Sequence, residues 1–152
     1  MAHFAKLGID NIVLNVVVVD DVNTSTIGGI EKEDLGLDYL ERTTGHANWK
    51  KCSYNTIDGV HVTGKTPLRV NFPSVGDYYD STNDIFHPPR PVDNDGTSCA
   101  SWTLDVKTAR RNPPITVPTL TDEQDQAGKY YAWNESEYQA DNTKGWILTS
   151  FS

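Results

Sequence analysis

Histidines and carboxylates are the side chains of this sequence that could support catalysis or metal binding, so their spacing is considered first. The four histidines are scattered, and none belongs to the His-Glu-x-x-His pattern that holds a catalytic zinc ion. No stretch combines a serine nucleophile elbow with a positioned base. We therefore expect no enzymatic activity, with a small hydrolase whose triad assembles only on folding as an alternative. The histidines are His3, His46, His61 and His87.

Two short motifs resemble parts of ligand-binding loops. The sequence DNDG at Asp93–Gly96 has the residue types of a calcium loop, but its glycine would place Pro91 at the first ligand position. The sequence TGKT at Thr63–Thr66 ends like a phosphate loop, yet it lacks the leading glycine, and Pro67 prevents the helix that should follow. Both motifs are interpreted as solvated turns, and the sequence predicts neither a metal ion nor a cofactor.

The charge balance argues against nucleic acid as a partner. The chain has 13 basic and 21 acidic residues, a net charge of −8, so it lacks the positive field that binds phosphate backbones. Hydrophobic residues make up 37% and charged residues 22% of the chain. This composition is too apolar for a disordered chain but polar for a self-contained globule. We expect many exposed loops, or burial of apolar surface against a partner.

Cysteine usage and hydropathy bear on the compartment. Cys52 and Cys99 are the two cysteines, and nothing in their spacing indicates zinc or a redox dithiol, so we expect reduced thiols in a chain made in a reducing cytoplasm. The first ten residues lack the features of a signal peptide. The apolar run IVLNVVVV is too short to cross a bilayer, and we expect no membrane partner.

The N-terminal third predicts a strand pair and one helix. Two β-rich runs flank Gly8, and the second, Ile12 to Val19, is so continuously apolar that it predicts a central strand covered on both faces. From Ile30 to Thr43 the apolar residues can share one helical face, and Gly45 is a plausible C-terminal stop. The interior Gly36 weakens this helix prediction.

A short pattern recurs in the second half of the chain. In YYDSTNDIFHPPRP, an aromatic pair and Asp80 precede two apolar residues and the proline pair that begins at Pro88. The same spacing separates Asp105 from the proline pair at Pro113, and a third copy keeps an aromatic residue before Asn134. Each copy predicts a hairpin in which the Asx side chain binds the turn and prolines end the strand. The proline-rich stretch after the second copy predicts an extended connector.

Together these elements predict a β-rich α+β fold. An N-terminal strand pair with one helix is followed by a series of short aromatic β-hairpins. We divide the chain into a compact αβ part at residues 1–55, a turn-rich connector at 56–76 and a hairpin-rich part at 77–152.

Aromatic residues concentrate where aliphatic residues are sparse. On hairpins they can form cross-strand pairs that hold a thin sheet together. The alternative is that they provide a stacking platform for sugar rings or the anchoring residues of a protein interface. Both interpretations stay open for the candidate residues, which are Trp49, Tyr78, Tyr79, Trp102, Tyr131, Trp133 and Trp146.

Most of the chain resembles a group of small proteins of tailed phages that infect marine cyanobacteria. The resemblance runs through MAHFAKLG.DN.V..VVVVDD, W..CSYNT..GVH..GKTPLR, NF...GD.YDSTNDIF.PPRP and SWTLD, and the part from Cys52 to Pro91 is the most specific. The chain departs from the group by reading NFP at Asn71–Pro73, where NYA is common, and by Arg111 and Asn112 where a tryptophan precedes the proline pair.

The resemblance implies an accessory component of the virion with no catalytic residues. We expect a decoration or protrusion protein on the capsid exterior, bound to capsid or other virion proteins. The alternative is a carbohydrate- or receptor-binding module associated with the tail fibre, whose partner would be a glycan of the host surface.

Overall fold

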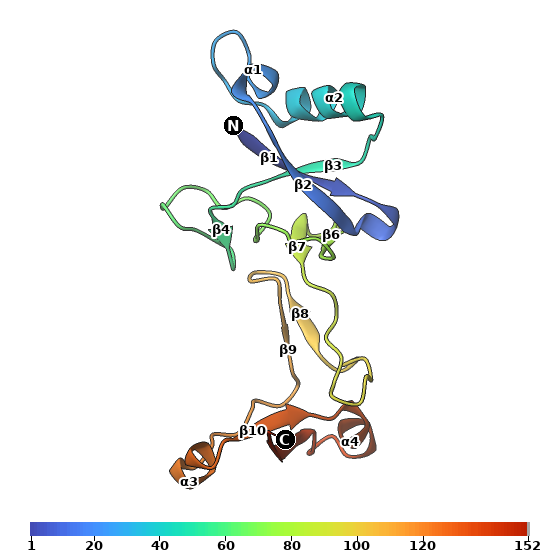
Figure 1. Ribbon diagram of the computed structural model, residues 1–152, viewed down its shortest axis with the longest axis vertical. Coiled ribbons are helices and arrows are strands. Elements are labelled where there is room, and N and C mark those ends of the chain that lie inside the picture. Colours follow the sequence, from blue (N-terminus) through green and yellow to red (C-terminus); the bar gives the residue numbers. More distant parts are fainter. Residues whose placement is uncertain (152) are drawn as a thin grey trace. The chain divides into compact units, whose positions relative to one another are not determined.

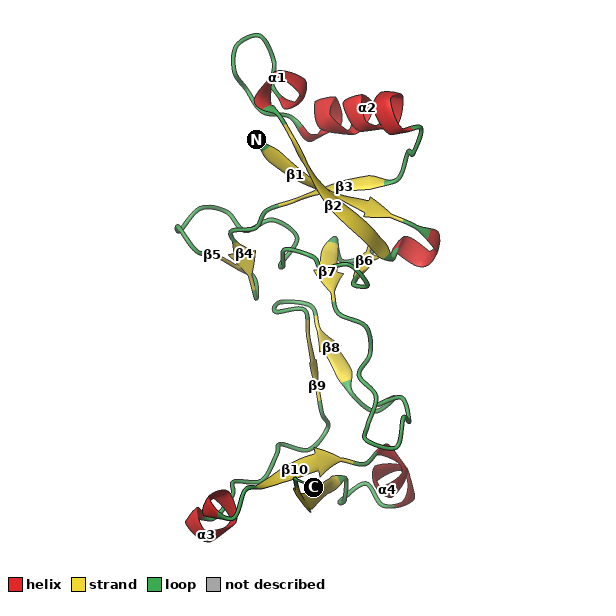
Figure 2. Cartoon of the chain, in the orientation of Figure 1, coloured by secondary structure: helices red, strands yellow, loops and turns green. Residues whose placement is uncertain are grey.

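The computed structural model describes residues 1–151 and shows the expected β-rich α+β fold, with several short antiparallel hairpins (Figures 1 and 2). The chain forms two compact units. The first contains Met1–Pro89 with Asp105–Arg110, and the second contains Arg90–Leu104 with Arg111–Ser152. The segment 56–76, which we expected to act as a connector, groups with the first unit.

The first unit contains a three-stranded antiparallel sheet. Strand β1 (Ala2–Leu7) lies between β2 (Val13–Val19) and β3 (Trp49–Cys52), and the 3-10 turn η1 (Ile9–Asn11) joins β1 to β2. The predicted N-terminal strand pair is therefore confirmed. The prediction that the valine-rich strand is central is wrong, because β2 lies at an edge.

The valine run of β2 reflects strand propensity more than burial on both faces. Leu14 and Val18 are 47% and 52% exposed. The strand covered on both faces is β1, where Phe4 contributes to one core cluster, and Ala5 and Leu7 contribute to the other. β-branched residues suit any pleated surface, so a run of valines does not identify the central strand.

Helix α2 (Glu33–Thr44) covers one face of this sheet (Figure 1). It ends at Gly45, which adopts the left-handed conformation with φ of 72° and so confirms the predicted stop. Leu40 packs in one core cluster with Phe4 and Trp49. Gly36 lies directly against the Phe4 ring, so this glycine permits the close approach of helix and sheet. A four-residue helix, α1 (Asp21–Thr24), precedes α2.

The opposite face of the sheet is covered by the first recurrent hairpin. Strands β6 (Tyr78–Asp80) and β7 (Ile85–His87) pair, and Tyr79 and Phe86 pack in the second core cluster. As predicted, the chain leaves the hairpin through prolines, and Asp80 Oδ1 accepts hydrogen bonds from the turn amides of Thr82 and Asn83 at 2.9 and 3.2 Å. The first unit also holds the small β4–β5 pair (Thr56–Ile57 and Val60–His61).

The second recurrent hairpin pairs β8 (Thr103–Asp105) with β9 (Arg110–Asn112). Asp105 Oδ1 accepts a hydrogen bond from the Lys107 amide at 2.9 Å, so the predicted Asx turn is confirmed here as well. Its turn residues, Asp105–Arg110, belong to the first unit, and the division of the chain therefore falls inside this hairpin.

The second unit is built on the antiparallel pair β10 (Lys129–Trp133) and β11 (Trp146–Ser150). Its connection contains helix α4 (Glu135–Ala140), so the third copy of the pattern is a strand, a helix and a strand. Asn134 uses its side chain to cap α4 by accepting from the Glu137 amide.

The proline-rich connector also differs from the prediction. It contains helix α3 (Asp122–Gln126), which a capping box between Thr121 and Gln124 starts. The sequence TDEQ carries this signal, and the prolines that precede it obscured it.

Candidate binding surfaces

Three tryptophans predicted as site residues meet in the second unit. The Trp133 and Trp146 rings lie opposite each other on β10 and β11, with centroids 5.2 Å apart and planes at 73°. Trp102 lies 6.0 Å from Trp133 and 6.2 Å from Trp146. Tyr138 of α4 completes the cluster at 5.4 Å from Trp133. These edge-to-face and tilted arrangements are favourable for aromatic rings, and the cluster forms the centre of this unit.

A buried carboxylate, Glu135, fastens the tryptophan cluster to its surroundings. It is 2% exposed and accepts hydrogen bonds from Trp133 Nε1 at 2.8 Å and Gln139 Nε2 at 2.9 Å. The amide and hydroxyl of Ser101 donate two further bonds, at 2.9 and 2.8 Å. Burial raises the pKa of Glu135, but the four donors outweigh it and hold the pKa below the ordinary value. The group is therefore a structural anion.

The DNDG segment also contacts Glu135, but at its backbone amide. Asp93 accepts a hydrogen bond from the Glu135 amide at 3.0 Å, and its other oxygen accepts from the amides of Asp95 and Thr97. The amide of Glu135 is the largest of the causes that lower the pKa of Asp93. The DNDG segment forms a turn, as we predicted from its unsuitable spacing for a calcium loop. The Asp93 carboxylate accepts hydrogen bonds from backbone amides.

A pocket of about 240 Å3 opens beside the tryptophan cluster. Its walls combine aromatic rings with the polar side chains of Asp93 and Asn94. Trp102 Nε1 is buried and has no hydrogen-bond partner among the described residues. Ligand pockets commonly join apolar walls with a few polar groups in this way. The aromatic residues of the wall are Trp102, Tyr130, Tyr131, Trp133 and Trp146.

The other predicted site residues lie in the first unit. Trp49 is 4% exposed, packs in the cluster beneath α2 and donates from Nε1 to the His46 carbonyl at 2.6 Å. Tyr79 is 7% exposed, and Tyr78 stacks on His87 with centroids 5.9 Å apart. The seven candidates are therefore divided between the two units, with Tyr131 in the second beside the three clustered tryptophans.

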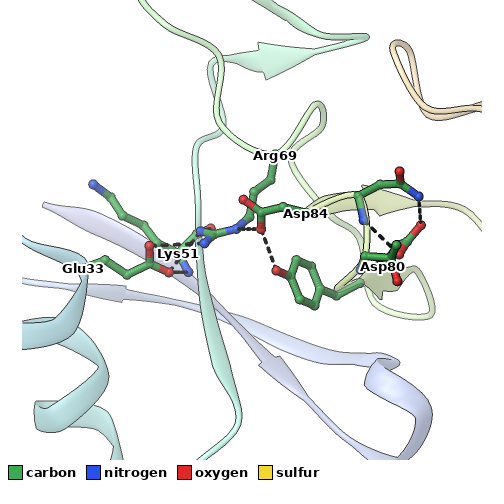
Figure 3. Close-up of polar contacts among 8 residues, drawn as sticks. Glu33, Lys51, Arg69, Asp80 and Asp84 are labelled. Atoms are coloured by element: carbon green, nitrogen blue, oxygen red, sulfur yellow. Dashed lines mark hydrogen bonds and ion pairs between the residues drawn. The ribbon is translucent and has the colours of Figure 1, made fainter.

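A charged cluster that sequence spacing did not reveal holds the first unit together. Figure 3 shows Arg69 between Glu33 of α2 and Asp84 of the β6–β7 turn, at 3.0 and 2.7 Å. The Tyr79 hydroxyl donates to the same Asp84 carboxylate at 2.5 Å. Burial lowers the pKa of Arg69, but its hydrogen bonds to Asp84 and Glu33 raise it above its ordinary value.

The same cluster occupies the outer edge of strand β3. The Lys51 amide donates to Glu33 Oε1 at 2.9 Å, and the Lys51 carbonyl accepts from Arg69 Nη1 at 2.8 Å. Burial raises the pKa of the neighbouring Cys52 thiol to about 12. Arg69 comes from the turn-rich segment after β5, and nothing in its local sequence indicates that it reaches Glu33, which lies 36 residues earlier.

Within residues 1–151, no helix is long and apolar enough to cross a membrane. No group of three or more metal-binding side chains is assembled in that same part of the chain. Both cysteines are buried and free. Comparison of the chain with family models, with curated proteins and with solved structures gives no match.

Proposed function

We propose that this chain is a non-enzymatic structural protein of a phage particle, attached to the capsid exterior as a decoration or protrusion. The observation that carries the proposal is the uncharged, half-exposed β2 edge of the first unit, where Leu14 and Val18 are 47% and 52% exposed. An exposed apolar edge strand promotes aggregation of a free protein, and in an assembly it can serve as an attachment site.

The region after β2 supports the same proposal. Val22 is 83% exposed and Ile30 is 63% exposed, while Ile27 at the tip of its glycine-containing turn is fully exposed. On a protein with a net charge of −8, exposed apolar side chains are more favourable when an interface buries them than when they stay on a free surface. The resemblance to accessory virion proteins is consistent with attachment to a shell.

The experiment is quantitative proteomics and imaging of purified particles. The expected result is a fixed ratio of this chain to the major capsid protein, with density on the shell exterior. Absence of the chain, or trace copies inside the DNA compartment, would contradict the proposal.

A second function is favoured by the pocket in the second unit. Its size of about 240 Å3, its aromatic walls and its two polar side chains suit a single sugar ring, as in a receptor-binding module of a tail fibre. Titration of the protein with host-surface saccharides, followed by tryptophan fluorescence, tests this function. Tyr131→Ala should abolish the response and Tyr54→Ala, an exposed tyrosine of the first unit, should leave it unchanged. Density confined to the tail tip would favour this second function.

A further inference from the structure

The two edges of the N-terminal sheet differ in how they are protected. The outer edge of β3 is closed at Lys51 by the charged side chains of Glu33 and Arg69. The outer edge of β2 is closed only at its beginning, where Val13 exchanges backbone hydrogen bonds with Gly76 and Asp77 at 2.9 and 2.8 Å. Beyond Val13 the edge carries no charged residue until Asp20.

The hydrogen-bond pattern shows which β2 groups face this edge. Along antiparallel strands, residues turn their backbone groups alternately toward and away from a given neighbour. Lys51 lies opposite Phe4, and its backbone amide forms a hydrogen bond on the side that faces away from β1. The backbone amide and carbonyl of Phe4 therefore point the other way, toward Val17 of β2. The groups of Val16 and Val18 therefore point to the open edge.

Side-chain protection of this edge is limited to one acceptor, the side-chain oxygen of Asn15. The Val16 amide donates to Asn15 Oδ1 at 2.8 Å, which agrees with its outward direction. No hydrogen bond within the described chain occupies the Val18 amide at this edge. Natural edge strands usually carry a lysine or a proline here, because unprotected edges pair with other chains. The β2 edge is thus competent to receive one more strand.

The charges at the two ends of the edge indicate the kind of strand it can receive. Asp77 stands at the beginning and Asp20 at the end, and the Asp20 carboxylate has no partner among the described residues. Asp21 pairs with the N-terminal amino group of Met1. A strand with a basic residue at each end would therefore be complementary to this edge.

A second copy of the chain fits this edge poorly. Antiparallel pairing of two β2 strands about Val17 would place Asp21 of one copy opposite Val13 of the other. Val13 is already hydrogen-bonded to Gly76 and Asp77. Asp21 of one copy would therefore approach Asp77 of the other, and the loop that contains Gly76 and Asp77 would obstruct the pairing. The segment between the acidic ends is about 20 Å long at roughly 3.3 Å per residue, enough for five or six residues.

We propose that the open β2 edge, at Leu14–Val19, binds an extended apolar segment of another protein whose ends carry lysine or arginine. The added strand bonds to the backbone of Val16 and Val18 and covers the exposed Leu14 and Val18 side chains. This inference rests on the proposed function, because it specifies how the first unit attaches to a larger assembly.

The test uses the purified chain and a labelled peptide of alternating valine and threonine with lysine at both ends. Fluorescence anisotropy should detect binding, and the amide NMR signals of Val16 and Val18 should shift. The same peptide with glutamate at both ends should bind about tenfold more weakly, because it meets Asp77 and Asp20 with like charge. Absence of binding by the lysine peptide, or equal binding of both peptides, overturns the proposal.

Variants of the chain separate this edge from general apolar stickiness. Val18→Lys should weaken binding about tenfold, since a charged side chain protects the edge. Ile57→Lys is the matched control, because Ile57 is 54% exposed against 52% for Val18, and it should change binding less than about twofold. Should Val18→Lys fail to fold, Asp20→Asn tests the same site and should reduce the preference for the lysine peptide.

The remaining outcomes are also decisive. Dimerisation that Val18→Lys abolishes would identify a second copy as the occupant and overturn the proposed partner. Absence of the chain from particles, together with normal binding of the lysine peptide, would reject the virion function and leave the edge inference standing. Presence of the chain on particles without binding of the lysine peptide would support the virion function and reject the edge inference.

Discussion

The Glu135 carboxylate shows how one side chain can determine the order of a small unit. It receives four donors from three residues, and its own amide binds Asp93. We expect Glu135→Gln to lower the free energy of unfolding of the second unit by about 1–3 kcal/mol, because a neutral amide leaves buried donors poorly paired. Denaturant unfolding followed by tryptophan fluorescence measures this. Glu137→Gln, on the exposed side of the same helix, should have an effect below about 0.5 kcal/mol.

The same carboxylate should make the second unit sensitive to acid. Its pKa in the folded chain lies below the ordinary value of 4.5, so the fold favours the charged form. Its contribution to stability is complete above about pH 4.5 and is lost as the pH falls through the lowered pKa. Thermal unfolding between pH 3 and pH 7, roughly the range over which carboxylates titrate, should show this loss. A Glu135→Gln variant with an unchanged acid dependence would contradict the assignment.

At the scale of elements, the contact of α2 with β1 depends on Gly36. A Cβ atom at this position would overlap the Phe4 ring, which is fully buried. Gly36→Ala should therefore destabilise the first unit by about 1–3 kcal/mol, although alanine is the better helix former. Gly28→Ala, where the surroundings are open, is the matched control. Circular dichroism during denaturation distinguishes the two, and a stabilised Gly36→Ala variant would show that the helix can shift outward.

Local sequence patterns predict where helices, strands and turns occur better than they predict which elements pair or pack together. The strand pair, the helix stop at Gly45 and the Asx turns at Asp80 and Asp105 each depend on residues a few positions apart, and the structure confirms them. The edge position of β2 depends on which strand pairs with β3, 30 residues later in the chain, so valine content alone misplaced it.

The candidate sites show the same limit of prediction from sequence. Aromatic composition identified the tryptophans, but the sequence could not assign Trp49 to one core and Trp133 to another. Arg69 and Glu135 were missed because their partners are distant in sequence or belong to other elements. Asn134 and Glu137 carry a helix-start signal, and this signal could have placed Glu135 in the first turn of a helix.

At the scale of the whole molecule, each unit has a core of its own. The first has two aliphatic and aromatic clusters around β1, and the second is centred on three tryptophans. Separate cores can open separately, even in one chain. A substitution in one core should therefore change the hydrogen exchange of its own unit and leave the other unit unchanged.

Trp133→Ala and Trp49→Ala form a reciprocal pair for this prediction, because the two side chains are 6% and 4% exposed and belong to different units. Each should destabilise its own unit by about 3 kcal/mol or more through loss of a buried indole. Hydrogen exchange read by mass spectrometry should show Trp133→Ala acting on β10 and β11, and Trp49→Ala acting on β1 to β3. If either substitution accelerated exchange across both units equally, the chain would unfold as one cooperative body. In that case an attachment made through β2 would also stabilise the tryptophan cluster, because binding to the native state stabilises everything that unfolds with it.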